Sequence, residues 1–412
     1  LQADKSGAIE SLSWKPAHAA NAGPGEVRLD LTAAGLNFRD VLFTLGMYPC
    51  DNVALGAECA GVVEALGPGV TTVKPGQQVF GFVPGSLANQ AVAPAAFIAP
   101  LPPNLTPAQA AAQPAAYLTA MLGLERIAAL APGQRVLIHA GAGGVGMAAM
   151  HLARRCGAQI FATAGSPAKR ALLRRMGAAV VSDSRSLTFA EEILAATNGA
   201  GVDVVLNSLG GDFIAAGLSA VAKGGWFLEL GKRGIWSSEQ MAAVRPDVRY
   251  RAYDLGDELA ADHGLARDLM AELAGRLESG ELQPLPVRVF DHGAVQDAFR
   301  LMSQGRHTGK LVVSAPRQRD AAHIVRADAT YWITGGLGAI GLKTARWLAK
   351  SGAGQIVLTG RRPPDDHART AIAACEALGA TVSVFAADAG DPAEMRTVFE
   401  EIQKMGPPLR GI

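Results

Sequence analysis

Short apolar runs separated by glycine and proline characterise residues 26–100. The clearest runs lie at 27–31, 60–65, 78–82 and 91–98. Runs of this length between turn residues are typical of β-strands. We therefore predict an irregular, mostly β domain in this part of the chain.

From about residue 107 the pattern changes to strands that alternate with helices. The predicted strands are 135–139, 159–163, 179–182, 202–207, 225–230 and 248–253. The helices between them are expected to begin near Gly144, Pro167, Phe189, Phe213 and Ser237. Alternation of this kind indicates a parallel, doubly wound sheet of the Rossmann type.

Beyond a helical stretch at 266–279, strands at 285–290 and 310–313 flank a helix at 294–304 and are expected to rejoin the first β domain. A second βαβ pattern follows, with strands at 330–334, 355–359 and 381–386 and a first helix at 342–351. We therefore predict an α/β protein. Its domains are expected at 1–110 with 260–316, at 111–259, and at 330–412 after a polar linker at 317–329.

Length and composition narrow the class of protein. A chain of 412 residues exceeds one ordinary core, and its net charge of +1 gives no electrostatic reason to bind nucleic acid or an anionic membrane. The most apolar long stretch, 110–131, carries Glu125 and Arg126 and is predicted to be an amphipathic helix rather than a membrane span. The chain begins at Leu1 and ends on an apolar run, so we expect it to be part of a longer protein.

The spacing of the cysteines indicates the redox compartment of the protein and whether cysteines could bind a metal ion. Cys50, Cys59, Cys156 and Cys375 are widely separated and form no CxxC pair. This spacing provides neither a disulfide framework nor a zinc site, and it predicts a reducing, cytoplasmic location.

Two glycine-rich loops follow apolar strands and precede helices. The first contains Gly141, Gly143, Gly144 and Gly146 around Val145, and the second contains glycines 336, 338 and 341. A strand, a glycine turn and a helix N-terminus present backbone N–H groups to a pyrophosphate. One such loop is weak evidence, but two in the right context indicate a fused enzyme with two nucleotide-binding units.

The choice of cofactor follows from the residues after the second strand of each unit. An NAD site usually has an acidic residue there, whereas this chain has Ser166, Lys169 and Arg170 and no acid before Asp183. A hydroxyl and cations suit a 2′-phosphate, so NADPH is predicted. For Arg170, a phosphate contact and a solvated helix-start cation are equally good interpretations. In the second unit, Arg361 and Arg362 favour the phosphate role.

Several motifs make a family resemblance specific. They are Gly35-Leu-Asn-Phe-Arg-Asp-Val41, Leu45-Gly-Met-Tyr-Pro49, the first glycine loop with His139 and Met147, Val205-Leu-Asn-Ser-Leu209, Glu229-Leu-Gly-Lys232 and His307-Thr-Gly-Lys-Leu311. Together they resemble the enoylreductase domain of modular (type I) polyketide synthases. This is a zinc-independent branch of the medium-chain dehydrogenase/reductase superfamily. The resemblance covers roughly residues 5–315, and from 330 the chain is similar to the start of a ketoreductase domain.

The resemblance implies a GroES-like substrate domain, a Rossmann domain and a partial short-chain-dehydrogenase-like unit. It also implies NADPH-dependent reduction of the α,β double bond of an enoyl thioester on an acyl carrier protein, in polyketide or related fatty acid synthesis. Neighbouring synthase domains are the other implied partners, and a homodimer is possible in the full synthase. A free-standing NADPH quinone or alkenal reductase and a non-catalytic cofactor-binding scaffold stay open as alternatives.

The family motifs imply three catalytic residues. Tyr48 would donate a proton or hydrogen bond, Lys232 would stabilise charge or donate a proton, and Asp254 would orient Lys232 and keep it charged. Each also has a structural interpretation, namely loop packing, a solvated strand-end lysine and a helix cap. In related synthases a tyrosine at the Tyr48 position accompanies the S configuration at an α-methyl branch. Asn37 and Asp40 are expected to hold the N-terminal loop, and His139 is expected to have no chemical role.

The same motifs imply a set of NADPH contacts. For the first unit they are Gly143, Gly144, Val145, Ser166, Lys169, Asn207, Ser208, Gly231, Lys310 and, near the nicotinamide amide, Thr119. For the second unit they are Gly336, Gly338, Gly341, Arg361, Arg362 and, beside the adenine, Asp388. The catalytic residues of a ketoreductase would lie beyond residue 412, and the sequence leaves open whether this segment folds or binds NADPH.

A catalytic metal is not expected. The zinc-dependent branch has Gly-His-Glu where this chain has Gly56-Ala-Glu58. Without the imidazole and without a cysteine cluster, the ligands of a zinc site are missing. Glu58 is then predicted to be structural, and Cys59 a small buried side chain.

Overall fold

The structure, a computed structural model, describes residues 1–4, 7–15, 20–48, 54–232, 234–316 and 325–412. Cys50 and most of the predicted linker lie outside these residues. The chain divides into two compact units, Leu1–Arg317 and Gln318–Ile412. The predicted subdivision of the first unit at 110 and 260 stays a prediction, but its two sheets are separate.

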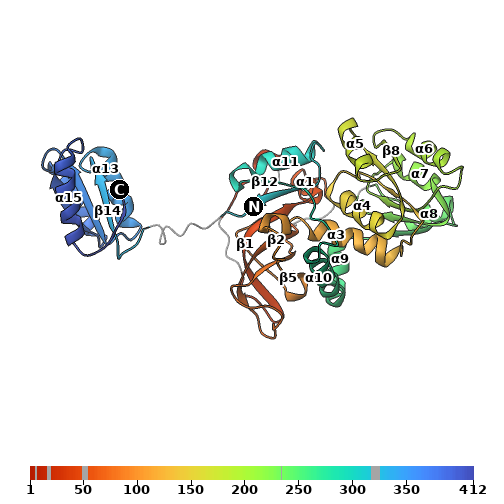
Figure 1. The fold of residues 1–412 in the computed structure, drawn as a ribbon, viewed down its shortest axis with the longest axis horizontal. Coiled ribbons are helices and arrows are strands. Elements are labelled where there is room, and N and C mark those ends of the chain that lie inside the picture. The colour runs from red at the N-terminus through yellow and green to blue at the C-terminus, as the bar shows by residue number, and fades with distance from the viewer. Residues whose placement is uncertain (5–6, 16–19, 49–53, 233, 317–324) are drawn as a thin grey trace. The chain divides into compact units, whose positions relative to one another are not determined.

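The strands of the β-rich part of the first unit form one seven-stranded sheet (Figure 1). Its order is β12-β13-β1-β2-β3-β5, and β4 also pairs with β1. β13 is antiparallel to β1, so the C-terminal strands of the unit do join the N-terminal sheet. The strands are β1 (Glu26–Leu36), β2 (Glu58–Leu66), β3 (Gln78–Phe82), β4 (Gln90–Pro94), β5 (Ile98–Pro100), β12 (Val287–Phe290) and β13 (Lys310–Ser314).

A six-stranded parallel sheet forms the rest of the first unit, in the order β11-β10-β9-β6-β7-β8. This is the strand order of dinucleotide-binding folds, in which ligands bind beyond the carboxyl ends of the strands where the winding reverses. Here that point lies between β6 and β9. The strands are β6 (Arg135–Ile138), β7 (Gln159–Ala164), β8 (Val180–Asp183), β9 (Val202–Asn207), β10 (Val221–Glu229) and β11 (Arg249–Ala252).

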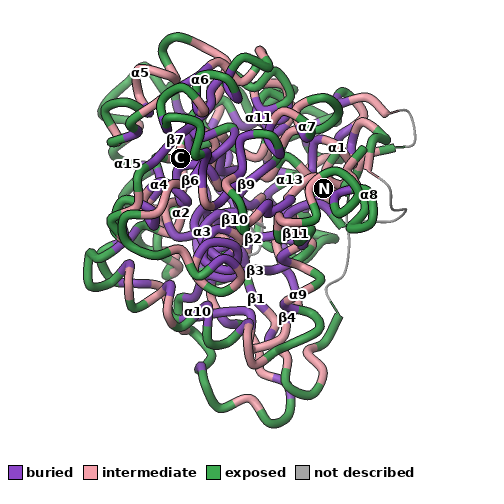
Figure 2. Tube along the Cα trace, turned by 90° about the vertical axis from the view of Figure 1, so that its right-hand side faces the viewer, coloured by how far each residue is buried: buried purple, intermediate pink, exposed green. Residues whose placement is uncertain are grey.

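One hydrophobic cluster packs helices against the parallel sheet through Val136, Ile138 and Val204, and another through Leu137, Phe161 and Val205, so helices cover both faces. The central strands of the sheet are buried (Figure 2). Residues 136–138 of β6 are fully buried, as a strand covered on both faces requires. The helices of the first unit are α1 (Phe38–Thr44), α2 (Pro107–Ala110), α3 (Pro114–Ala120), α4 (Gly144–Cys156), α5 (Pro167–Arg175), α6 (Phe189–Ala196), α7 (Asp212–Ser219), α8 (Ser238–Val244), α9 (Leu255–Ala261), α10 (His263–Glu278) and α11 (Val295–Ser303).

The single amphipathic helix expected over 110–131 is wrong. α2 ends at Ala110, α3 starts at Pro114, and the chain continues as a π-helical segment, Met121–Ile127. Most of this stretch is buried rather than half exposed, because α4 and α10 both pack against α3. Its two charges face α10, where Glu125 pairs with Arg276 at 2.8 Å and Arg126 pairs with Glu272 at 2.6 Å. No helix among the described residues is both long and apolar enough to cross a membrane.

The second unit has a four-stranded parallel sheet in the order β16-β15-β14-β17. One hydrophobic cluster lies under α13 and α14, and another lies under α15. Two layers of helices therefore enclose this sheet as well. Its elements are β14 (Thr330–Thr334), α13 (Ala339–Lys350), β15 (Gln355–Gly360), α14 (Asp366–Glu376), β16 (Thr381–Ala386), α15 (Pro392–Lys404) and β17 (Leu409–Gly411).

Candidate active site

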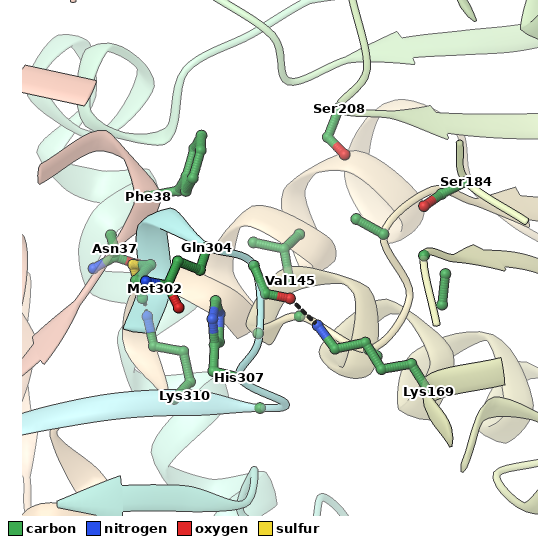
Figure 3. Close-up of a pocket in the computed structure, with 18 of the residues that line it drawn as sticks. Asn37, Phe38, Val145, Lys169, Ser184, Ser208, Met302, Gln304, His307 and Lys310 are labelled. Atoms are coloured by element: carbon green, nitrogen blue, oxygen red, sulfur yellow. Dashed lines mark hydrogen bonds between the residues drawn. The ribbon is translucent and has the colours of Figure 1, made fainter. Parts of the chain in front are cut away.

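Two adjoining cavities lie at the carboxyl edge of the six-stranded sheet. The first has a volume of about 460 Å³ and the second about 490 Å³. Phe38 and Ser208 line both, on opposite walls (Figure 3), together with Ala140, Gly143, Val145 and Leu209. Because the two cavities share these walls, they form one continuous cleft. Residues from both sheets of the first unit line it.

The first glycine loop forms the floor of this cleft. A Cβ atom on Gly146 would lie 2.5 Å from the Cα atom of Gly141, so the tight turn requires glycine at 146. A Cβ atom on Gly143 would meet only the carbonyl oxygen of Ala140, at 3.4 Å. Gly143 is the N-cap of α4, and the first turn of a helix has N–H groups with no partner inside the helix. The loop therefore presents open backbone donors to the cleft.

A segment from the first sheet closes one side of the first cavity. The N–H of Gly309 donates to the carbonyl oxygen of Ala142 at 3.0 Å. The Lys169 ammonium donates to the carbonyl oxygen of Gly305 at 2.8 Å (Figure 3). His307 lies between these two contacts in sequence and lines the same cavity. Burial lowers the pKa of His307 to about 4, and its Nδ1 atom has no partner in the described part of the chain.

Lys169 and Arg185 line the first cavity and provide positive charge there. Burial, and then the charge of Arg185, lowers the pKa of Lys169. Arg170, in contrast, donates to Asp183 at 2.9 Å and to the carbonyl oxygen of Ala164 at 3.1 Å. The sequence left Arg170 open between a phosphate contact and a solvated cation, and it gave no signal for Arg185. Asp183 is the acidic residue that could have bound a ribose hydroxyl, and Arg170 neutralises it.

Three predicted cofactor residues have side chains engaged elsewhere. Ser166 caps α5 by accepting from the N–H of Lys169 at 3.3 Å. The Thr119 hydroxyl donates within its own helix, to the carbonyl oxygen of Ala115 at 2.6 Å. Asn207 is fully buried and bonds to Leu209 and Glu229. None of these three is among the residues that line the two cavities.

Lys310 has structural partners that the sequence did not predict, and its contact with the cofactor stays a prediction. Its ammonium lies 2.6 Å from Glu58, and it donates to Asn37 at 2.6 Å and to the carbonyl oxygen of Leu36 at 3.0 Å. Both Lys310 and Glu58 are buried. The stem of Lys310 still lines the first cavity, packed beside Gly144. Its charge, however, is used to hold β13, β2 and the start of α1 together.

The remaining oxygen of Glu58 accepts from the backbone N–H of Ala115 at 2.8 Å. Asp40 holds the neighbouring loop, because one of its oxygens accepts from the N–H of Asn37 at 2.9 Å and the other from the N–H of Gly56 at 2.8 Å. Asn37 and Asp40 therefore organise this loop, as expected. Cys59 is buried, and burial raises the pKa of its thiol.

The second cavity brings the three predicted catalytic residues together. Lys232 lies 3.0 Å from Asp254 and 3.6 Å from Asp257, and Tyr48 lines the same cavity. Asp254 is also the N-cap of α9, so the capping interpretation holds, while its role in orienting Lys232 for catalysis stays a prediction. Gly231 and Ser208 line the wall beside Lys232.

Burial and neighbouring charges raise the pKa values of Lys232 and Tyr48. Burial disfavours the Lys232 ammonium, but the hydrogen bond and charge of Asp254 outweigh it, so the pKa of Lys232 is raised. The pKa of Tyr48 is raised by burial and by the Asp254 carboxylate. Both side chains therefore carry a proton at neutral pH. A cleft with a proton-bearing lysine and tyrosine at one end can protonate or hydrogen-bond a substrate there.

Sequence reasoning did not assign Arg39, although it lies within a quoted motif. Arg39 lines the second cavity, and among the described residues it has no hydrogen-bond or ion-pair partner. His139 lines this cavity as well, with its Nδ1 atom 3.1 Å from the Thr163 hydroxyl. Burial lowers the pKa of His139 to about 3, which keeps the ring neutral.

Comparisons with known proteins agree with this geometry. Family models match in the order "Alcohol dehydrogenase GroES-like domain" (residues 23–103), "Zinc-binding dehydrogenase" (176–313) and "KR domain" (329–412). Among solved structures, the CurK enoyl reductase is 40% identical with a TM-score of 0.72, and the match covers 76% of this chain and 98% of that one. The JamJ enoyl reductase is 36% identical with a TM-score of 0.72, covering 75% and 96%.

The chain belongs to the enoyl reductase family. The start of a ketoreductase domain follows the enoyl reductase. Among curated relatives, a phenolphthiocerol/phthiocerol polyketide synthase component of Mycobacterium tuberculosis is 40% identical over all of this chain, which spans 19% of that protein. The pikromycin polyketide synthase component PikAII of Streptomyces venezuelae is 42% identical over 98% of this chain, which spans 11% of that protein. The chain thus spans about a fifth or less of these relatives.

The matching dehydrogenase model is named for zinc, yet the donor set of this enoyl reductase does not fit a metal. Ala57 precedes Glu58, and both Glu58 oxygens already accept hydrogen bonds or pair with Lys310. Within the described residues, no group of three or more His, Cys, Asp or Glu side chains is arranged to hold a metal ion. The Lys310 ammonium supplies the positive charge that balances Glu58.

The second glycine loop, in the ketoreductase-like unit, has nearly the same geometry as the first. A Cβ atom on Gly341 would lie 2.6 Å from the Cα atom of Gly336, and one on Gly338 would lie 3.4 Å from the carbonyl oxygen of Gly335. Gly335 has a φ of 64°, and the corresponding Ala140 has a φ of 51°. Both loops therefore provide the same backbone cradle.

The other cofactor residues predicted in this unit lie at its surface. Arg361 and Arg362 are exposed after β15. Asp388 accepts from the N–H of Gly390 at 3.0 Å, so its side chain shapes the turn before α15. A nucleotide role for these three residues stays a prediction.

Proposed function

We propose that this protein uses NADPH to reduce the α,β double bond of an enoyl thioester carried on an acyl carrier protein during polyketide synthesis. The single observation that carries this proposal is the layout of the cleft. Open backbone donors and cations occupy one end, and the Lys232–Asp254 pair with Tyr48 occupies the other. The family membership supports the same reaction.

The first cavity suits the phosphate-bearing part of NADPH. Backbone donors at the start of α4 suit a pyrophosphate, and Lys169 with Arg185 suits a 2′-phosphate. A mycobacterial relative described as complexed with NADPH is 26% identical with a TM-score of 0.70. When bound, NADPH would supply a hydride from its nicotinamide C4 atom to the substrate β-carbon.

The residues of this chain would manage charge and the proton. Reduction at the β-carbon moves negative charge to the thioester oxygen, where a nearby cation or N–H donor stabilises it. We assign that role to the Lys232 ammonium, which Asp254 holds in place and keeps protonated. Tyr48, whose hydroxyl is protonated at neutral pH, is the candidate donor to the α-carbon.

The partners and location follow from the same reasoning. An acyl carrier protein would deliver the enoyl-phosphopantetheine to the second cavity, where Arg39 offers a cation for the polar part of the arm. Neighbouring synthase domains would flank this piece, and the full synthase would form a homodimer. A cytoplasmic location is proposed on the spacing of the cysteines.

A substrate comparison tests the proposal. The protein is incubated with NADPH and either crotonyl-pantetheine or a naphthoquinone, and NADPH oxidation and product mass are followed. We expect thioester turnover to a product two mass units heavier. Quinone-only turnover would support the free-standing reductase instead, in line with a quinone oxidoreductase that is 30% identical with a TM-score of 0.70. Tight NADPH binding without turnover would support the scaffold.

Variants then separate the two proton-bearing groups. Lys232→Met is expected to lower kcat by about 10²–10⁴-fold with little change in NADPH affinity, because general acid–base groups contribute by that factor. Tyr48→Phe is expected to change the α-carbon configuration with an α-methyl substrate, or to slow protonation. Val244→Ala, on the exposed face of α8, provides a matched control outside the cleft. Wild-type rates in both cleft variants would show that neither group acts.

A further inference from the structure

Asn207 and Glu229 form a buried pair at the ends of two neighbouring strands. They are paired residues in the register of β9 and β10, and both are fully buried. The Asn207 amide nitrogen donates to Glu229 at 2.6 Å. The other Glu229 oxygen accepts from the backbone N–H of Gly231, also at 2.6 Å.

Each member of this pair also holds the loop that follows its own strand. The Asn207 amide nitrogen donates to the carbonyl oxygen of Leu209 at 2.7 Å, and its oxygen accepts from the N–H of Leu209 at 3.2 Å. These contacts fix the Asn207 amide in one orientation. Glu229 holds Gly231 directly, and a Cβ atom on Gly231 would lie 2.7 Å from the Glu229 carboxylate. The close contact therefore requires glycine at 231.

The two held loops form one wall of the second cavity. Residues 208–210 follow β9 and residues 230–232 follow β10, and all of them line that cavity. Lys232 is next in sequence to Gly231, whose N–H Glu229 holds. A shift of the Gly231 backbone would therefore move the Lys232 ammonium relative to Tyr48 and the cleft floor. The Lys232–Asp254 contact alone does not fix this backbone, because a lysine side chain has several rotatable bonds.

The Glu229 carboxyl is poised between two charge states. Burial raises its pKa to about 7, although hydrogen bonds from Asn207, Gly231 and Leu230 favour the ionised form. Tyr250 on β11 is the other titratable group that interacts with it, and its hydroxyl donates to the carbonyl oxygen of Trp236. On the cleft side, Lys232 is paired with Asp254. The ionised carboxylate accepts from both donors, so the pair is strongest above neutral pH.

We propose that Glu229 and Asn207 act as a clamp that positions the Lys232 loop for reduction, with Glu229 as a positioning residue. This inference rests on the proposed function, because Lys232 is the group being positioned. The clamp bears mainly on the chemical step, since Gly231, which Glu229 holds, and Lys232 line the second cavity and not the first. Its loss should therefore lower kcat and leave NADPH affinity in place.

Glu229→Gln tests the clamp by turning one acceptor into a donor. In one orientation the NH₂ group of the new amide faces the Gly231 N–H, and that hydrogen bond is lost. In the other orientation it faces the NH₂ group of Asn207, and the Asn207 amide cannot turn over because Leu209 bonds to both of its ends. We expect kcat for crotonyl-pantetheine to fall about tenfold, with the NADPH Kd within about twofold of wild type. The wild-type kcat should rise with pH through about 7, and the variant should lack this rise. Glu239→Gln, at the exposed start of α8, removes the same charge as a control.

A double variant keeps the test informative if the single variant folds poorly. Asn207→Asp with Glu229→Gln reverses donor and acceptor across the pair and restores an acceptor for the Gly231 N–H, although it loses the donor to the Leu209 carbonyl oxygen, so it should recover part of the lost kcat. Hydrogen exchange gives a readout independent of turnover, because the amide of Gly231 should exchange faster in Glu229→Gln and be protected again in the double variant. If the wild type turns over the thioester and Glu229→Gln matches its kcat, pH profile and exchange, the clamp is refuted. If the wild type does not turn over the thioester, the proposed function fails, and the exchange result still decides whether the clamp exists.

Discussion

Removing the charge of Lys310 distinguishes a structural from a cofactor-binding lysine. Lys310→Met keeps the length of the stem beside Gly144 but leaves the Glu58 carboxylate buried with only Asn37 and Ala115 as partners. Breaking a buried ion pair from one side costs about 3–5 kcal/mol. At about 2 °C per kcal/mol for a unit of this size, Tm should fall by roughly 6–10 °C.

Two measurements decide this prediction. Differential scanning calorimetry gives Tm for Lys310→Met and for Lys310→Met with Glu58→Gln, in which no buried charge is left unpaired. We expect the double variant to recover most of the loss. Fluorescence titration should give an NADPH Kd within about threefold of wild type, because the ammonium faces Glu58 and not the cavity. A wild-type Tm combined with a tenfold weaker Kd would show that Lys310 binds the cofactor and that our reasoning is wrong.

Further variants test three points, namely cofactor choice, the proposed role of Lys232 and stability in acid. Arg185→Ala should weaken NADPH binding about tenfold without affecting NADH binding. Arg170→Ala should change neither Kd by more than about threefold, because Arg170 pairs with Asp183 outside the cavity. Equal effects of Arg185→Ala on both nucleotides would refute a 2′-phosphate role for Arg185. Asp254→Asn should move the alkaline limb of the kcat/KM profile to lower pH, since Asp254 raises the pKa of Lys232; an unmoved limb would contradict this. Burial lowers the pKa of His139 to about 3 in the folded protein, whereas the pKa of a histidine in the unfolded chain is about 6.5. Below about pH 6.5 only the unfolded chain binds this proton, so the free energy of unfolding falls as the pH drops from 6.5 towards 3, by about 2 kcal/mol at pH 5. Urea unfolding at pH 7.5 and 5.0 should show a smaller drop for His139→Gln, and an equal drop would exclude His139 as the cause.

The elements of both Rossmann-type units could be predicted because their signals are local. The strands expected at 202–207, 330–334 and 381–386 have those bounds in the structure. Two loops that differ in sequence also share one geometry, because spacing alone fixes where glycine must replace a side chain. The helix expected over 110–131 failed for the opposite reason. Its burial depends on α4 and α10, which the local pattern does not report.

The sequence could predict which polar residues lie near the site, but not which partners their side chains have. Arg170 and Arg185 are both basic residues near the second strand, and only their tertiary surroundings show that Asp183 engages Arg170. Lys310 is likewise engaged by Glu58, which lies far from it in sequence. Glu229 lies inside a quoted motif, but its contact with Asn207 is visible only once the strands pair. Partners distant in the chain decide what each polar side chain does.

Transfer of deuterium from labelled NADPH to the substrate tests most directly whether this protein reduces an enoyl thioester. The protein is incubated with crotonyl-pantetheine and NADPH deuterated at nicotinamide C4 on the transferred face, and the product is analysed by mass spectrometry and NMR. We predict a saturated thioester with one deuterium at the β-carbon, and one at the α-carbon when unlabelled NADPH is used in D₂O. Recovery of unreduced thioester, or of a product without deuterium at the β-carbon, would contradict enoyl reduction by this protein.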